Sequence, residues 1–370
     1  MWLALIFFGL YGVLLLLAAN RWSNSKFNLE SFSQTLPQSV SVVIAFRNEQ
    51  QVLLALINSL RSIKYPAEKL EFLFINDHST DDSMSILRRE LDDFPFEHTI
   101  IEQSANLTGK KYAQLQGVKN AANEIVIATD ADCVVSSNWV YEMQSGFGNK
   151  DIHFIAGNLT FIGSDFWSAL LRIEMAPLLG VTGLAIEFSH PMLANGANMA
   201  FRKSSYLYVL EHRRDMGVRA SGDDVFLLEA IKNVYGAKAI GFNKVNVIET
   251  MAPQSVTVFY NQRVRWASKW RANRSFFAAI PALAIWLFHL LFIALLVAGL
   301  LSFQWLLIIF LLLFKGIGEY FFIATVFKSY PYRMNLIAFI LLTFFYSFYV
   351  IFFGLSGNFG RYKWKDRKYG

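Results

Sequence analysis

Residues 40–77 read VSVVIAFRNEQQVLLALINSLRSIKYPAEKLEFLFIND, and this stretch decides the fold class. Its first part, Val40–Phe46, is an unbroken apolar run rich in β-branched residues, which is typical of a strand buried on both faces. An amphipathic helix is predicted over residues 47–63, and Glu71–Ile75 is predicted to form a second buried strand. A strand, a helix and a strand in this order predict a unit with two parallel strands.

The same alternation continues along the chain. His98–Gln103 and Ile125–Thr129 are predicted as further strands, with a helix over Gly109–Ala122 between them. Ser79 or Thr80 is suited to cap the helix that follows the second strand. Strands that alternate with helices predict an α/β fold with a mostly parallel sheet covered on both faces.

Composition divides the chain into membrane and water-soluble parts. The 370 residues are 54% hydrophobic and include 35 Phe, and the mean hydropathy is +0.35, which is too apolar for an ordinary soluble domain. The apolar residues gather at the two ends, and the single cysteine, Cys133, excludes an internal disulfide. We therefore expect an N-terminal transmembrane anchor (1–20), a globular domain (21–274), a C-terminal transmembrane bundle (275–356) and a basic tail (357–370).

Three apolar runs in the predicted C-terminal bundle are long enough to span a membrane: Ala278–Leu301, Gln304–Phe327 and Leu336–Gly354. Three spans after a cytoplasmic domain place the tail outside, whereas its basic residues favour the inside. One resolution of this conflict is that Gln304–Phe327 is re-entrant or is broken between Lys315 and Glu319. These two residues are four apart, so on a helix they share a face and can pair.

Charge and the first apolar run set the expected location. Lys and Arg number 34 against 28 Asp and Glu, a net charge of +6, and much of the excess lies beside the apolar runs. Positive residues there mark the cytoplasmic side of a membrane, and this placement disfavours a nucleic-acid partner. The run up to Ala19 lacks a basic start and a clear cleavage site, which favours an uncleaved anchor over a signal peptide. We expect an integral protein of the bacterial inner membrane with its globular domain in the cytoplasm.

Polar residues follow three of the predicted strands. Arg47 and Glu49 follow the first strand, Asp77 the second, and Asp130 and Asp132 the fourth. In parallel sheets the carboxyl ends of the strands share one edge, where ligands bind. The two neighbouring aspartates repel each other unless a cation lies between them, which suits Mg²⁺ or Mn²⁺ held together with substrate phosphates. The alternative is an acidic loop without a ligand.

Other candidate residues each have a structural alternative. Asp77 either hydrogen-bonds a base or ribose or caps the next turn. Lys110 either neutralises a phosphate or lies exposed at the start of a helix. Asp223 and Asp224 begin an amphipathic helix, where acids are favoured electrostatically, and Asp224 is also suited to take a proton from an attacking hydroxyl.

A last group of candidates lies beside the predicted C-terminal bundle. Gln262, Arg265 and Trp266 fall on a helix predicted over residues 253–274. Arg can hold a diphosphate through two hydrogen bonds, and Trp can stack on a sugar ring. The alternative is that basic and aromatic residues are simply common at membrane interfaces.

The joint order of these motifs is specific. VSVVIAFRNE, INDHSTDDS, GKKYAQLQG, IATDADC, NGANMAF, GDDVFLLEAI and QRVRW follow one another along the chain. In this order the chain resembles the family-two inverting glycosyltransferases. Within them it is similar to the membrane-embedded group with a D, D-x-D, acid-Asp and Q-x-x-R-W series, which is related to polysaccharide synthases and lipid or ceramide-type glucosyltransferases. The resemblance covers nearly the whole chain.

The resemblance implies a GT-A fold, a nucleotide-sugar donor and a divalent metal, Mg²⁺ or Mn²⁺. It implies that Asp224 is the catalytic base, with Asp223 at the position that is often Glu. Asp132, together with Asp130, matches the metal-binding pair. Asn195–Asn198 looks like the loop between donor and acceptor. The residues that the resemblance assigns to the donor are Ala45, Arg47, Glu49, Asp77, Lys110, Asp130, Gln262, Arg265 and Trp266.

Two departures from the family pattern shape the expected reaction. Ala45 stands where the family often has Pro, and only one apolar run precedes the globular domain, fewer than polysaccharide synthases of this group usually have. We therefore expect transfer of a single sugar, from a donor expected to be UDP-linked, to a membrane lipid. The alternatives are a processive polysaccharide synthase that extends a glycan and a non-catalytic membrane scaffold that binds a nucleotide sugar.

Overall fold

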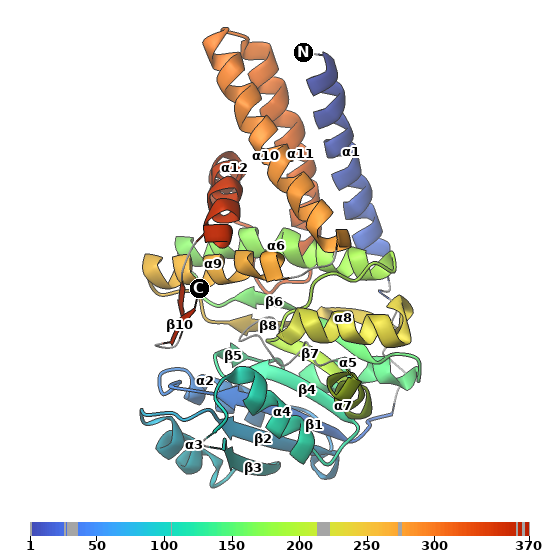
Figure 1. Ribbon diagram of the computed structural model, residues 1–370, viewed down its shortest axis with the longest axis vertical. Helices are drawn as coiled ribbons and strands as arrows, with labels where there is room; N and C mark the ends of the chain where they lie inside the picture. The colour runs from blue at the N-terminus through green and yellow to red at the C-terminus, as the bar shows by residue number, and fades with distance from the viewer. Residues whose placement is uncertain are drawn as a thin grey trace. The chain divides into compact units, whose positions relative to one another are not determined.

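The computed structural model describes residues 2–25, 27, 36–104, 106–212, 223–272, 276–359, 362–364 and 367–369. The chain divides into two compact units, which are described separately (Figure 1). The sheet unit comprises Ser25–Ile162 and Val181–Met251. The helical unit comprises Met1–Asn24, Gly163–Gly180 and Ala252–Gly370. Residues 163–180 and the helix predicted over residues 253–274 therefore group with the apolar helices at the chain ends.

The sheet unit is built on one eight-stranded sheet in the order β3-β2-β1-β4-β7-β6-β8-β5. The first four strands are parallel to one another, whereas β7 is antiparallel to both of its neighbours and β5 is antiparallel to β8. The predicted α/β class with a parallel-rich sheet is confirmed. The strands are β1 (Val40–Phe46), β2 (Leu70–Asn76), β3 (Glu97–Glu102), β4 (Ile125–Asp130), β5 (Cys133–Val134), β6 (Phe154–Phe161), β7 (Asn198–Arg202) and β8 (Ile240–Thr250).

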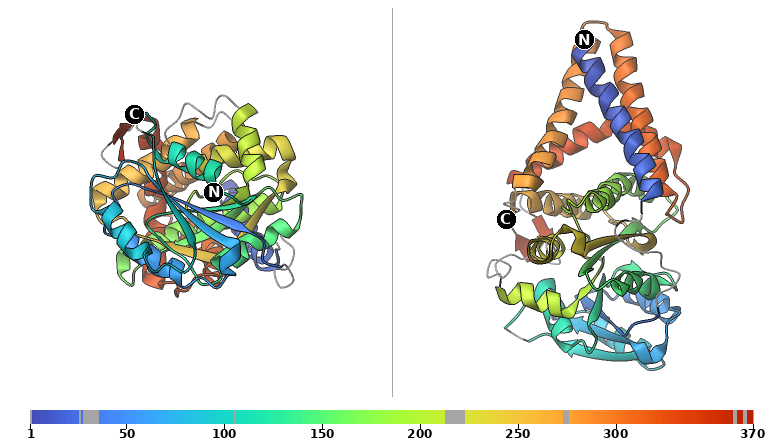
Figure 2. Two further views of the ribbon diagram at one scale, coloured as in Figure 1. Left: turned by 90° about the horizontal axis from the view of Figure 1, so that it is seen from below. Right: turned by 90° about the vertical axis from the view of Figure 1, so that its right-hand side faces the viewer.

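Helices connect these strands and cover the sheet. The central strands are almost wholly buried, as their apolar runs predict, and helix α4 packs on β1 and β2 (Figure 2, left). The helices of this unit are α2 (Leu53–Arg61), α3 (Ser83–Leu91), α4 (Lys110–Asn120), α5 (Trp139–Ser145), α7 (Lys203–His212) and α8 (Asp223–Tyr235).

The prediction that the first helix opens at residue 47 is wrong. Helix α2 begins only at Leu53, and Asn48 has a positive φ of 51°, which no right-handed helix contains. The Asn48 backbone N–H donates to Ser79 Oγ over 3.1 Å, so Ser79 braces this loop and does not cap α3. Helix α3 follows Asp82, which makes no side-chain cap bond. A contact between two distant loops has replaced the local helix and cap.

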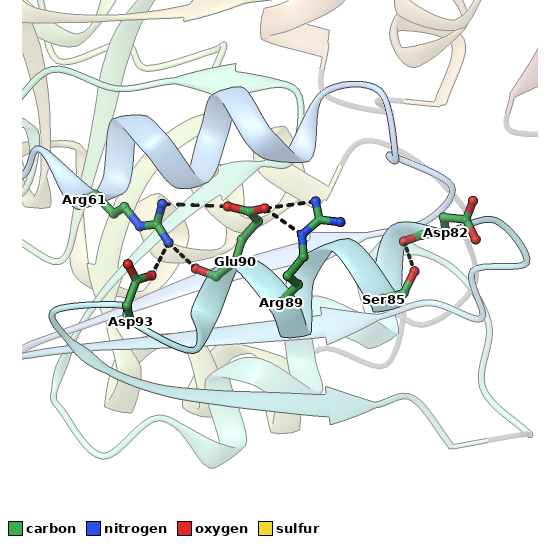
Figure 3. A network of polar contacts seen from close by, with 6 residues as sticks. All are labelled: Arg61, Asp82, Ser85, Arg89, Glu90 and Asp93. Atoms are coloured by element: carbon green, nitrogen blue, oxygen red, sulfur yellow. Dashed lines mark hydrogen bonds and ion pairs between the residues drawn. The ribbon is translucent and has the colours of Figure 1, made fainter.

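Helices α2 and α3 are joined by a surface network of charged groups (Figure 3). Arg61 donates to the Glu90 carbonyl over 2.5 Å and to the Asp93 carboxylate, and Arg89 forms an ion pair with the Glu90 side chain at 2.9 Å. The Asp93 side chain is 82% exposed. Solvent-exposed pairs of this kind contribute little to stability, so the network joins the C-terminal ends of the two helices and is not interpreted as a site.

The helical unit contains α1 (Trp2–Asn24), α9 (Val256–Ala272), α10 (Phe276–Leu301), α11 (Trp305–Phe327), α12 (Leu336–Phe359) and the hairpin strands β9 (Tyr362–Trp364) and β10 (Arg367–Tyr369). Helix α6 (Phe166–Glu187) begins in this unit and ends in the sheet unit. Five helices in the described part of the chain are long and apolar enough to cross a membrane: α1, α6, α10, α11 and α12. The apolar character of α6 was not predicted. Helix α11 runs without a break through Lys315 and Glu319.

Helices α1 and α11 pack side by side in the helical unit (Figure 2, right). A methyl group added to Gly318 of α11 would lie only 3.0 Å from Gly12 Cα of α1, closer than ordinary van der Waals contact. Next to this contact, Tyr11 Oη donates to Glu319 Oε1 over 3.1 Å. Lys315 Nζ donates to Glu319 Oε2 over 2.9 Å and to the Thr343 carbonyl over 3.0 Å, which confirms the predicted pairing.

This packing predicts unequal effects for two glycines of α11. Gly318→Ala is expected to lower the free energy of unfolding by about 1–3 kcal/mol, because the methyl group overpacks the contact with α1. Gly316→Ala is the matched control, since its methyl group would meet only Thr343 Cγ2, at 3.9 Å. Both changes raise helix propensity equally, so their difference reports the contact. Thermal unfolding in detergent, followed by circular dichroism, measures it, and equal melting temperatures would contradict the close packing of α1 on α11.

Candidate active site

The carboxyl ends of β1, β2 and β4 form the floor of the candidate active site. Ala45 pairs with Ile75 of β2 on one side and with Asp130 of β4 on the other. Asp77 directly follows β2, and its backbone N–H donates to the Phe46 carbonyl over 2.9 Å. The polar residues predicted at three strand ends therefore do share one edge of the sheet, where ligands bind in α/β folds.

Asp77 is held from two directions. Arg47 Nη1 donates to the Asp77 carbonyl over 2.9 Å, and the Gly109 backbone N–H donates to Asp77 Oδ1, also over 2.9 Å. Gly109 has a φ of 112°, in the region that favours glycine, and it directly precedes α4. Asp77 therefore fixes the start of α4, so its side chain has a structural role. This contact also sets the position of Lys110, the first residue of that helix.

Lys110 and Asp224 converge at Gly196. Lys110 Nζ and Asp130 Oδ1 form an ion pair in which both side chains are about one third exposed. A methyl group added to Gly196 would lie 3.5 Å from Lys110 Nζ and 3.7 Å from Asp224 Oδ2. A cation and a carboxylate from distant segments thus lie next to a residue without a side chain, and the cation is paired with the Asp130 carboxylate.

The Asp224 carboxylate is buried, with 9% of the residue exposed, and is fixed by backbone donors. The Val225 N–H donates to Oδ1 over 2.9 Å, and the Gly196 N–H donates to Oδ2 over 3.1 Å. Asp224 lies in the first turn of α8, where the helix dipole also favours a negative charge. Asp223 is the first residue of the same helix, and its side chain lies outside the described part of the structure.

Asp132 lies in the turn between β4 and β5 and is half-buried. The thiol of the next residue, Cys133, lies 3.7 Å from Asp132 Oδ1. Burial, followed by the charges of Asp132 and Asp130, raises the pKa of the Cys133 thiol well above its usual range. The thiol is therefore protonated at neutral pH.

The donor set fits a divalent ion that is bound together with substrate. Asp130 and Asp132 supply oxygen ligands, which Mg²⁺ and Mn²⁺ prefer. Among the described residues, no group of three or more His, Cys, Asp or Glu side chains is close enough to hold a metal by itself. An ion at Asp132 would therefore complete its coordination with phosphate oxygens and water, which is how Mg²⁺ is usually bound.

The remaining predicted residues lie on a loop of the sheet unit and on a helix of the helical unit. Glu49 is in the loop after β1, where its backbone N–H donates to Ser83 Oγ over 2.8 Å. Gln262, Arg265 and Trp266 lie on α9 of the helical unit, and all three are half-buried. The loop of Gly196 is indicated only by the family resemblance, because an Asn-Gly-Ala-Asn segment carries no chemical signal of its own.

Comparison with known proteins identifies the core of the sheet unit. Residues 41–209 match the family model described as Glycosyl transferase family 2. This part of the chain is a family 2 glycosyltransferase domain. The match contains Ala45, Asp77, Lys110, Asp130 and the other predicted strand-end residues, and it ends before Asp224 and α9.

Relatives of known description agree with this family 2 domain. A protein described as "Probable glycosyltransferase YdaM" from Bacillus subtilis is 23% identical over 233 residues, which are 62% of this chain and 54% of that protein. The poly-β-1,6-N-acetyl-D-glucosamine synthase of Staphylococcus aureus is 25% identical over 235 residues, again 62% of this chain and 54% of that protein. The chain thus matches about half the length of these relatives.

A solved structure shows the fold around the family 2 domain. The mannosyltransferase PcManGT from Pyrobaculum calidifontis, in complex with GDP-Man and Mn²⁺, superposes with a TM-score of 0.54 at 20% identity. The superposition covers 72% of this chain and 71% of that protein. The predicted GT-A fold is confirmed.

Proposed function

We propose that this chain is an inverting glycosyltransferase that moves a sugar from a nucleotide-sugar donor to an acceptor hydroxyl. The observation that carries the proposal is the convergence of Lys110 and Asp224 at Gly196, within 3.5 and 3.7 Å of the same point. A cation next to a fixed, buried carboxylate supplies the two groups that the reaction needs, one for the leaving diphosphate and one for the attacking hydroxyl.

In the proposed mechanism Asp224 is the general base. Its carboxylate takes the proton of the acceptor hydroxyl, whose oxygen attacks the anomeric carbon from the face opposite the nucleotide. The bond to the diphosphate oxygen breaks as the new glycosidic bond forms, so the configuration inverts. The two backbone N–H donors on Asp224 hold its oxygens in one orientation before the substrate arrives.

Positive charge stabilises the departing diphosphate. Lys110, held in place by Asp130, supplies a cation at the strand ends. Arg265 of α9 is proposed to bind the diphosphate as well, because a guanidinium matches phosphate oxygens in a bidentate manner. A divalent ion held by Asp132 and Asp130 would neutralise further charge on the diphosphate when bound. The bound Mn²⁺ in the mannosyltransferase of similar fold supports this assignment.

The acceptor has two candidate classes, and we place the reaction at the cytoplasmic face of a membrane. A membrane lipid that receives a single sugar is the first candidate, as expected from the sequence. A growing glycan is the second candidate, since a relative makes poly-β-1,6-N-acetyl-D-glucosamine. In both cases the apolar helices of the helical unit provide the membrane attachment.

The deciding experiment is turnover of a panel of UDP- and GDP-sugars by the full chain in detergent, with membrane lipids and with Mg²⁺ or Mn²⁺. We expect metal-dependent nucleotide release with one donor and a radiolabelled product in the lipid fraction. Product length separates a single transfer from polymerisation. Donor binding without release of nucleotide, across the whole panel and several lipid extracts, would contradict the transferase assignment and favour a non-catalytic binding protein.

A further inference from the structure

A buried ion pair links three helices of the helical unit. Arg263 of α9 and Glu174 of α6 are 2% and 5% exposed at their side chains, and their contact is bidentate. Arg263 Nε donates to Glu174 Oε1 over 2.7 Å, and Nη2 donates to Oε2. Tyr349 of α12 joins the pair through its hydroxyl, which donates to Glu174 Oε1 and accepts from Arg263 Nε over 3.0 Å.

Stability alone is a weak explanation for this pair. Burying two charges costs solvation free energy that their attraction barely offsets, and apolar residues of similar size often serve as well or better. What a bidentate pair does supply is geometry, because both nitrogens and both oxygens must keep their relative positions. The aromatic ring of Phe259 lies 4.6 Å from the Arg263 guanidinium carbon and further restricts its position.

The same guanidinium contacts two residues of the Q-x-x-R-W segment. Arg263 Nη1 donates to Gln262 Oε1, and the Trp266 ring centre lies 4.3 Å from the Arg263 guanidinium carbon. Glu174 and Tyr349 thus contact Nε and Nη2 of Arg263. The Gln262 amide contacts Nη1, and the Trp266 indole lies next to the guanidinium carbon. Movement of Arg263 would move both of its neighbours.

We propose that Arg263, anchored by Glu174, is a positioning residue that sets the orientation of Gln262 and Trp266 for the donor diphosphate and the sugar. The role of Arg263 at the donor rests on the proposed function, whereas its anchoring by Glu174 concerns only α6, α9 and α12. It assigns a role to Glu174, on a helix that sequence patterns did not predict, and to the variable second position of the motif.

The test combines two measurements on Glu174→Gln. This variant keeps the shape of the side chain and removes its charge, which weakens the hold on Arg263. We expect kcat/KM for the donor to fall roughly 10- to 100-fold at unchanged folded fraction, since displacement by about 1 Å has effects of that size. Glu174→Gln and Gln262→Ala are expected to be non-additive, because both act through the same amide. Tyr349→Phe leaves the ion pair in place and is expected to have a smaller effect.

The second measurement does not depend on turnover. The fluorescence emission of Trp266 is obtained by subtracting the spectrum of the Trp266→Phe variant from that of the full chain. The subtraction is made with and without Glu174→Gln. A change in this emission is expected, because the cation next to the indole loses its anchor. Glu319→Gln, which breaks the pair of Lys315 and Glu319 in the helical unit, is the matched control and is expected to lower stability without changing the Trp266 emission or the donor KM.

The outcomes are distinguishable. Unchanged Trp266 emission in Glu174→Gln, or strictly additive effects of Glu174→Gln and Gln262→Ala, would overturn the positioning role while leaving the glycosyltransferase assignment intact. Absence of turnover by the unmodified chain with every donor would instead overturn the proposed function and, with it, the role of Arg263 at the donor. A changed Trp266 emission together with non-additive losses of kcat/KM would support both the anchoring of Arg263 by Glu174 and its role at the donor.

Discussion

Replacing Asp224 by Asn is expected to lower kcat by roughly 10²- to 10⁴-fold, the range that a general base contributes. The amide has the size of the carboxylate but cannot take up the proton of the acceptor hydroxyl. Asp224 makes hydrogen bonds through both oxygens, so the variant also has to accommodate one amide nitrogen next to a backbone N–H. The affinity for the donor nucleotide should nevertheless stay within a few fold, because no phosphate-binding role is assigned to this residue.

Single-turnover rates and nucleotide binding by calorimetry measure these two quantities for Asp224→Asn. Glu229→Gln provides a matched control, since it removes an acid from a half-buried position on the same helix, α8, and is expected to leave kcat unchanged. An Asp224→Asn enzyme that turns over at the rate of the unmodified chain would rule out this residue as the base.

Loss of the metal is predicted to have the second large effect. Removing divalent ions with a chelator should abolish turnover reversibly, and Asp132→Asn should lower kcat/KM at least about 100-fold at fixed Mn²⁺. The physical reason is that the proposed ion carries several kcal/mol of the stabilisation of charge on the leaving diphosphate. Asp132→Asn should also raise the Mn²⁺ concentration that gives half-maximal rate.

Metal titrations of the initial rate test this prediction. Asp151→Asn, which neutralises an exposed acid of the sheet unit before β6, is the control for a general change in charge and should leave the titration midpoint in place. Full activity in the presence of a chelator would show that Lys110 and the arginines suffice for the diphosphate, and the role of Asp132 would have to be abandoned.

Strands β1, β2 and β4 could be predicted from sequence because each is a short apolar run that is almost wholly buried. Val40–Phe46 has the predicted bounds. Strand β4 ends one residue later than predicted, β2 is one residue longer at each end, and β3 is shifted by one residue toward the N-terminus. A strand buried in this way depends on its own composition more than on its neighbours. The edge that β1, β2 and β4 share follows from their parallel order, so the positions of Asp77 and Asp130 could be predicted too.

The loops and the helical connections could not be predicted in the same way. Residues 47–50 look amphipathic, but their backbone conformation is decided by hydrogen bonds to a loop 31 residues away. The convergence at Gly196 depends on where two later segments fold back, which no local pattern reports. Helix α6 was missed because Arg172 and Glu174 interrupt its apolar sequence, and their partners are distant: Arg172 lies over the ring of Tyr332, and Glu174 pairs with Arg263.

The contact between Tyr11 and Glu319 joins positions 308 residues apart, and this bears on how the protein is made. At the usual pace of translation, roughly 5–20 residues per second, α1 waits about 15 to 60 s for its partner helix. In the proposed membrane setting α1 enters the bilayer before α11, and the Tyr11 hydroxyl is the most polar side-chain group between residues 6 and 19. Helix α11 brings Lys315 and Glu319 within a single turn, so the two charges arrive already neutralising each other. Each helix is therefore suited to insertion on its own, and the tight glycine contact can form last, as two inserted helices associate.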